Sequence, residues 1–91
     1  MEIEVTLPGL LRDSVDGPYP LRVAGTTLAE ALEDLLDRHP RLRVHLYDEQ
    51  GQLRPHVLLY FNEDNIAWLD PLATPLRPGD RVHVLQAVSG G

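Results

Sequence analysis

One strong helix signal stands in this chain, and it limits the folds that the rest of the sequence can adopt. Thr27 is followed three residues later by Glu30, the spacing of a capping box, in which each side chain bonds a free backbone N–H at a helix start. Apolar residues then recur at the spacing of one helical face until Pro40, which ends the helix. We therefore expect an amphipathic helix over residues 28–39. Because a single helix covers only one face of a sheet, the remaining segments must supply that sheet.

Five other segments carry the pattern of β-strands. Residues 2–7 alternate apolar with polar side chains, and residues 19–24 are expected to return beside them as an N-terminal hairpin. Residues 56–61 form the most hydrophobic run of the chain and are the best candidate for a central strand. Residues 66–68 make a short return, and residues 81–87 alternate again as the last strand.

The segment from Arg41 to Asp48 fits two different structures. Leu42, Val44 and Leu46 alternate as they would in a strand. Leu42, Leu46 and Tyr47 also suit a short helical turn. Periodicity does not decide between the strand and the helix, and both alternatives stay open at this point.

The order of these elements predicts an α+β fold of the β-grasp (ubiquitin-like) type. A mixed sheet of four to five strands would have the main helix packed on one face. With 91 residues and 43% hydrophobic content, the chain supports one core, so residues 1–87 are expected to form a single β-grasp domain. Residues 88–91 would then form a flexible C-terminal tail. This tail follows the last strand, which is expected in the middle of the sheet.

That tail reads Val88-Ser89-Gly90-Gly91, and its composition suits a narrow channel. Glycine has no Cβ, so Gly90 and Gly91 can lie close against channel walls. Four extended residues span about 13 Å. We expect the tail to carry the main-chain carboxylate of Gly91, as the reactive group, into the active site of a partner, while Val88 and Ser89 lie in the docking region.

The apolar run at residues 56–61 predicts a docking surface, because both of its faces are apolar. If Val57, Leu59 and Phe61 face the core, Leu58 and Tyr60 must face the other way. Together with two residues of the last strand they would form an exposed apolar patch beside the tail, which is typical of a protein interface. The predicted docking residues of the two strands are Leu58, Tyr60, His83 and Leu85.

Charge and cysteine content exclude several classes of partner and chemistry. The chain has no cysteine, which removes disulfides, thiolate metal sites and a cysteine nucleophile. Its net charge of −6 argues against nucleic acid and anionic membranes and favours a basic protein partner. All eight basic residues are arginine, so without lysine only the N-terminal amine could accept an acyl group. With neither a secretory signal nor a long apolar stretch, we expect a cytoplasmic protein.

No catalytic or metal-binding pattern is found in the sequence. The four histidines lack metal-ligand spacing, so no metal site is expected. Ser14 and Ser89 do not lie in a strand-to-helix elbow, so a catalytic triad has no support. We expect no catalytic residue in this chain, and no permanently bound cofactor.

Several segments, in order, resemble the ubiquitin-like sulfur carriers of the MoaD/ThiS type. Their joint spacing covers nearly the whole chain, and the loop after Pro40 is more similar to the molybdopterin-synthase small subunit and the cysteine-biosynthesis carriers than to the shorter thiazole carriers. Gln86 and Ser89 depart from the usual proline and alanine at these positions. The matching segments are residues 27–32, 39–40, 46–49, 51, 53–54, 57–64, 74–76 and 78–80 and the Gly-Gly end.

The resemblance implies a cycle of activation at the C-terminal glycine. An E1-like adenylyltransferase and sulfurtransferase would adenylate the Gly91 carboxylate with ATP, and sulfur would replace AMP to give a thiocarboxylate. The sulfur would pass to a synthase, either cysteine synthase-like or the molybdopterin synthase large subunit, or to tRNA thiolation. For a cysteine-type carrier, a metalloprotease would release the cysteinyl product.

Two other functions remain open from the sequence. The chain could be the small subunit of molybdopterin synthase, held permanently against a large subunit. It could also be a ubiquitin-like protein modifier conjugated through Gly91 to target lysines. The final sulfur acceptor is left undecided by the sequence.

Overall fold

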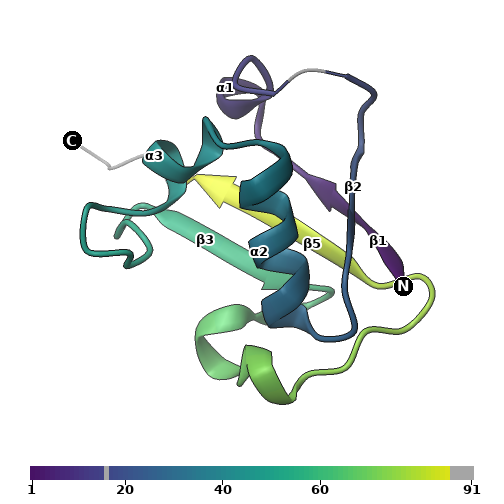
Figure 1. The fold of residues 1–91 in the computed structure, drawn as a ribbon. Coiled ribbons are helices and arrows are strands. Elements are labelled where there is room, and N and C mark those ends of the chain that lie inside the picture. Colours follow the sequence, from purple (N-terminus) through teal and green to yellow (C-terminus); the bar gives the residue numbers. More distant parts are fainter. Residues whose placement is uncertain (16, 87–91) are drawn as a thin grey trace.

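A mixed sheet of five strands forms the centre of this computed structural model, which describes residues 1–15 and 17–86 (Figure 1). The strands lie in the order β2-β1-β5-β3-β4. Strand β1 pairs parallel with β5, and the other neighbours are antiparallel. The strands are β1 (Glu2–Thr6), β2 (Leu21–Ala24), β3 (Val57–Phe61), β4 (Asp64–Asn65) and β5 (Arg81–Gln86). This architecture confirms the predicted α+β fold with a mixed sheet.

The main helix, α2 (Leu28–Arg38), crosses one face of the sheet (Figure 1). The side chain of Thr27 accepts the backbone N–H of Glu30 at 3.3 Å, as the capping box predicts. The Glu30 carboxylate instead reaches one residue further back, to the backbone N–H of Thr26 at 2.7 Å and its hydroxyl at 2.8 Å. These bonds, that from the Thr26 backbone first, hold the pKa of Glu30 below its usual value. The helix ends one residue earlier than expected, with His39 as its C-cap.

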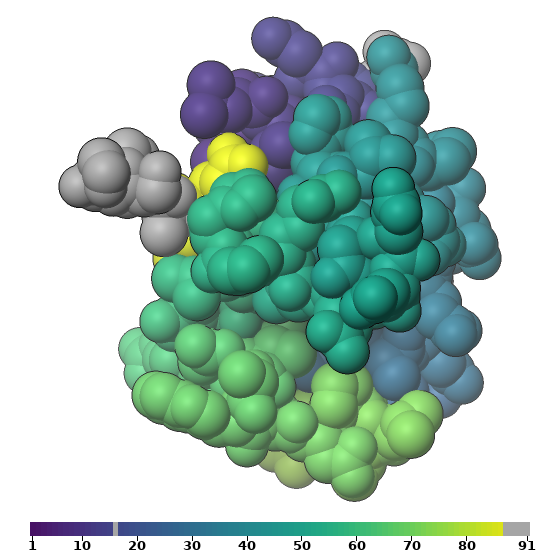
Figure 2. Space-filling model, turned by 90° about the vertical axis from the view of Figure 1, so that its left-hand side faces the viewer, coloured from purple at the N-terminus to yellow at the C-terminus, as the bar shows by residue number. Residues whose placement is uncertain are grey.

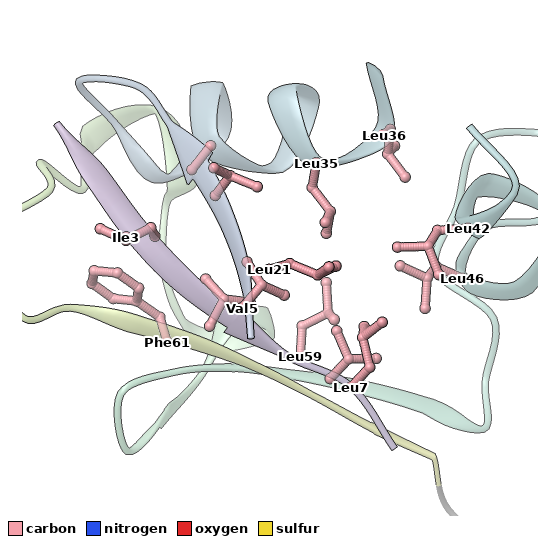
Figure 3. Packing of buried hydrophobic residues seen from close by; sticks show 14 of the residues in the cluster. Ile3, Val5, Leu7, Leu21, Leu35, Leu36, Leu42, Leu46, Leu59 and Phe61 are labelled. Carbon is pink, nitrogen blue, oxygen red and sulfur yellow. The ribbon is translucent and has the colours of Figure 1, made fainter. Parts of the chain in front are cut away.

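The core lies between α2 and the sheet (Figure 3). Leu35 and Leu36 of the helix point toward the sheet, where Val5 and Leu59 lie opposite them. Further core residues are Ile3, Val23, Val57, Phe61, Val82 and Val84. Among the described residues no polar or charged residue is fully buried, so the domain is stabilised mainly by apolar packing.

The ambiguous segment after Pro40 is a helix, α3 (Leu42–Leu46). Leu42 and Leu46 lie one helical turn apart and are completely buried at one end of the core (Figure 3). Val44, which a strand would have placed on their face, is 64% exposed. A strand would have buried Val44 together with the two leucines, so the exposure of Val44 distinguishes the helix from the strand.

Some predicted element positions are wrong by a short distance. The last strand, β5, lies in the middle of the sheet as expected, and β3 lies beside it with a neighbour on each edge. The hairpin strand, however, begins at Leu21 rather than Tyr19. The short return strand expected at residues 66–68 is wrong, since these residues form a 3₁₀ helix and the return strand is β4, two residues earlier. Three short helices follow no long-range periodicity and were not predicted: α1 (Gly9–Arg12), η1 (Ile66–Trp68) and η2 (Pro71–Ala73).

No helix in the two described ranges has the length and apolar character that a membrane span requires.

Candidate functional site

The four residues predicted for docking lie together on the face of the sheet opposite α2. In the antiparallel pairing of β3 with β5, Leu58 lies opposite Leu85 and Tyr60 opposite His83. Directly opposed residues share a face, with Cβ atoms about 4.5–5.5 Å apart. Leu85 is 47% exposed, and the other three are half-buried. The apolar patch, as we call these four residues, is therefore open to a partner.

The strand residues between them point into the core, as expected. Val57, Leu59 and Phe61 are buried on β3, and Val82 and Val84 are buried on β5. This alternation assigns one face of each strand to folding. The apolar side chains on the other face are not needed to fill the core beneath α2.

His83 is held in place on this face by a hydrogen bond that the sequence analysis did not identify. Thr6 of β1 lies in register with His83 in the parallel pairing, and its Oγ1 is 2.7 Å from Nδ1 of the imidazole. A bond at one ring nitrogen orients the ring. The outward alternation of Glu2, Glu4 and Thr6 along β1 was the signal that could have revealed this contact.

The remaining part of the open face is charged. Glu4 of β1 is 3.4 Å from an Nη of Arg22 on β2 and 3.6 Å from Nε of Arg81 on β5. All three side chains are partly exposed, so each ion pair contributes at most about 1 kcal/mol to stability. The open face thus combines an apolar patch over β3 and β5 with charged groups over β1 and β2.

The open face is next to the point where the last strand ends. β5 runs as far as Gln86, opposite Val57, one residue beyond Leu85. Its end (yellow) reaches the surface between the N-terminal segment (purple) and the middle of the chain (teal-green) (Figure 2). Within the described residues, the Gln86 Oε1 atom is buried without a hydrogen-bond partner. The other predicted site residues, Val88, Ser89, Gly90 and Gly91, lie outside the described residues.

The requirements of a metal centre are not met by the described residues. Across residues 1–15 and 17–86, no group of three or more histidine, aspartate or glutamate side chains could hold a metal ion. The arrangement that these residues do form is an exposed apolar patch next to the end of the central strand.

Known proteins with similar sequences or structures are small carriers and modifiers. Sulfur carrier protein CysO of Mycobacterium tuberculosis is 31% identical over 93 aligned residues, which span all of both chains. SAMP1 from Haloferax volcanii, a small archaeal modifier protein, matches with a TM-score of 0.78 and 26% identity over all of both chains. The Amycolatopsis orientalis BexX/CysO complex gives a TM-score of 0.77 at 27% identity, covering 98% of this chain and 99% of the matched one.

These likenesses confirm the β-grasp, ubiquitin-like fold. The family model described as "ThiS family" matches residues 5–91, which include the main helix, both strands of the apolar patch and the Gly-Gly end. The described fold and the full-length match to CysO agree with that model. On these grounds, the chain belongs to the ThiS family.

Proposed function

We propose that this protein is a sulfur carrier that bears sulfur as a thiocarboxylate on Gly91. The observation that carries the proposal is the match to CysO, a protein named as a sulfur carrier, over the entire length of both chains. The chain itself has no cysteine, so any sulfur it carries must be attached by added chemistry. The main-chain carboxylate of Gly91 is the group that we assign to this role.

The chemistry would proceed in two balanced steps on a partner enzyme. The Gly91 carboxylate attacks the α-phosphorus of ATP, pyrophosphate leaves, and an acyl-adenylate forms. A sulfur nucleophile at the oxidation level of sulfide then adds to the carbonyl carbon and AMP leaves, which gives the thiocarboxylate. The sulfur is then passed to an acceptor. This chain would supply the activated carboxyl group and the docking surface, while the partner would supply the catalytic groups. This division agrees with the likeness of the chain to carriers and modifiers.

The apolar patch is the surface that we assign to the activating, E1-like partner. It lies beside the end of β5, so a partner seated on it would be close to the residues that follow Gln86. Exposed apolar side chains surrounded by charged groups are typical of a recognition surface. Here the charged surround comes from Glu4, Arg22 and Arg81.

A sulfur-accepting enzyme is the second partner that we propose. The solved structure of Amycolatopsis orientalis CysO is a complex with BexX, so a similar carrier forms a complex with another protein. A metalloprotease that releases a product from Gly91, and location in the cytoplasm, remain predictions of the sequence analysis.

Intact-mass analysis of the protein isolated from its native cell tests the carrier function. Replacing one carboxylate oxygen by sulfur should increase the mass by about 16 Da, and fragmentation should place the increase on Gly91. A control variant extended by one alanine beyond Gly91 should not gain this mass. Unmodified protein under conditions in which the native cell makes the sulfur-containing product would contradict the proposal.

The likeness to SAMP1 favours a second candidate, a protein modifier conjugated through Gly91. Without lysine, this chain could modify lysines of other proteins but could be extended only at its N-terminal amine. Immunoblots distinguish the two functions, since a modifier gives adducts of higher mass that disappear when Gly90 and Gly91 are deleted. If the chain were instead a permanent subunit of molybdopterin synthase, it should purify as a stable heterotetramer, whereas a carrier should purify alone.

A further inference from the structure

A basic groove lies at the β2 edge of the sheet, away from the apolar patch. It consists of two adjoining depressions, with cavity volumes of about 300 and 150 Å³, which share Arg38 and His39 in their linings. One wall consists of described residues before β2 and the first residues of β2, and the other is the C-terminal end of α2 with the residues that follow it. The residues before β2 are Ser14, Val15, Pro18 and Pro20. We call this feature the basic groove.

The side chains that line the groove are basic, although Arg22 also lies 3.4 Å from the Glu4 carboxylate and Arg38 lies 2.7 Å from the Asp34 carboxylate. Arg22, Arg38 and Arg41 line it together with His39, and the described lining residues include no carboxylate. Three of the eight arginines therefore gather at one place in a chain of net charge −6. A guanidinium has five N–H donors, so an arginine that already binds one carboxylate can still bind a second oxyanion.

Arg38 is fixed in place at the edge of the groove. Its Nε donates to the Asp34 carboxylate at 2.7 Å, and the same carboxylate oxygen accepts the backbone N–H of Ala24 at 2.8 Å. This contact uses Nε. The two terminal Nη nitrogens take no part in it, and such a pair can bind an oxyanion end-on. Arg22 reaches Glu4 only at 3.4 Å through one Nη, so its guanidinium also retains donors.

Two of the outward-facing backbone positions at the exposed edge of β2 cannot donate to an added strand. Pro20, directly before β2, has no N–H to donate, and the N–H of Ala24 at the other end is already taken by Asp34. Pro18 and Pro20 give the groove apolar surface instead. This edge therefore offers a ligand few backbone hydrogen bonds, and the arginine side chains and the apolar walls supply most of the contacts.

We propose that the basic groove binds an acidic, extended segment of a partner protein. Its carboxylates would bind Arg22 and Arg38, and small apolar side chains between them would contact Pro18 and Pro20. The two adjoining depressions give the groove the length for such a segment. The proposal goes beyond the carrier function, since it involves neither Gly91 nor the four residues of the apolar patch. Arg22 is the one residue that it shares with the charged surround of that patch.

A titration followed by ¹H–¹⁵N NMR tests this proposal on the full chain. The probe is a short capped peptide in which glutamate alternates with alanine and leucine, and the control peptide has glutamine at each glutamate. We expect the acidic peptide, but not the control peptide, to cause saturable chemical-shift changes. These changes should occur at the backbone amides of Leu21, Arg22, Arg38 and His39. Binding should weaken with added salt, because the charges are at the surface.

Matched variants then assign the binding to the arginines. Arg22→Gln and Arg38→Lys should each weaken binding by roughly threefold to tenfold, the first by loss of charge and the second by loss of the planar fork. Arg77→Gln, which removes an exposed arginine outside the groove, should leave the affinity unchanged. The dispersion of the spectra reports whether each variant is folded.

Three outcomes would overturn the proposal. The first is shifts of equal size with the glutamine peptide, and the second is an equal loss of affinity in Arg77→Gln. The third is the same shifts at the same residues with inorganic phosphate at equal concentration, which would make the groove a simple anion site. Deleting Gly90 and Gly91 abolishes the proposed carrier function but should not change peptide binding, so the two proposals can fail separately.

Discussion

The two faces of the β3–β5 pair have nearly the same apolar character but different surroundings. Leu59 and Val84 lie under α2 and are almost fully buried, whereas Leu58 and Leu85 lie on the open face with no helix above them. The same kinds of side chain thus serve folding on one face and, as we propose, recognition on the other. An apolar run in a strand therefore does not by itself show how many of its residues stabilise the fold.

The largest expected effect separates the two faces by stability. Leu59→Ala should lower the free energy of unfolding by about 2–5 kcal/mol, because it removes buried contacts and leaves a cavity. Leu58→Ala, at the next position on the same strand, should cost less than about 1 kcal/mol. Urea denaturation of both variants measures the difference. Equal losses would mean that the open face is as important for folding as the covered face.

The second prediction separates the faces by binding. Changing Leu58 and Leu85 together to Asp should weaken binding to the activating enzyme at least about tenfold, since charges replace the centre of an apolar interface. The free energy of unfolding should change little. Titration calorimetry measures the affinity.

The matched control is Leu72→Asp, which places the same charge at a residue that is 78% exposed in η2, outside the apolar patch. The control should bind as the unchanged protein does. If it loses as much affinity as the double variant, the effect comes from charge alone and the apolar patch has no special role.

A smaller effect is expected from loosening the helix that makes the two faces different. Thr27→Ala removes the side-chain acceptor for the Glu30 N–H at the start of α2 and should cost about 1 kcal/mol of stability. Thr27→Ser keeps that acceptor and should be nearly neutral. Affinity for the activating enzyme should be the same in both variants, and a drop in either would show that α2 also takes part in binding.

The smallest effect is a dependence of stability on pH at the same helix start. The pKa of Glu30 is lowered in the folded protein by the bonds from Thr26, so its ionised form stabilises the fold. This contribution is complete above the ordinary pKa of glutamate and is lost as the pH falls through the lowered value. Glu30→Gln should lack this dependence, which unfolding curves measured between neutral and acidic pH would detect. Parallel curves for the two proteins would contradict it.

Much of the fold follows from local pattern, and the errors have a common physical cause. The α2 helix, the hairpin of β1 with β2 and the alternation of β5 are dictated by neighbouring residues. The position of a strand within the sheet is not, because it depends on partners that are distant in sequence. The order of the elements nevertheless placed the last strand, β5, in the middle of the sheet. β3, a candidate central strand because both of its faces are apolar, is an interior strand whose outer face is not covered by a helix.

The candidate sites also differ in how far the sequence could predict them. The apolar patch could be predicted because two alternating strands fix which side chains share a face. The Thr6–His83 bond and the basic groove could not, since each joins segments far apart in the sequence. Short helices such as α1 were missed because four residues are too few to show a period.

The position of β5 between β1 and β3 has a mechanical consequence. Each edge of this last strand is bonded to a neighbour, in parallel on one side and antiparallel on the other. A partner that draws on the end of the strand would load both rows of hydrogen bonds in shear, so that they must yield together rather than peel apart one at a time. Another enzyme could therefore pull on this end of the chain without unravelling the domain.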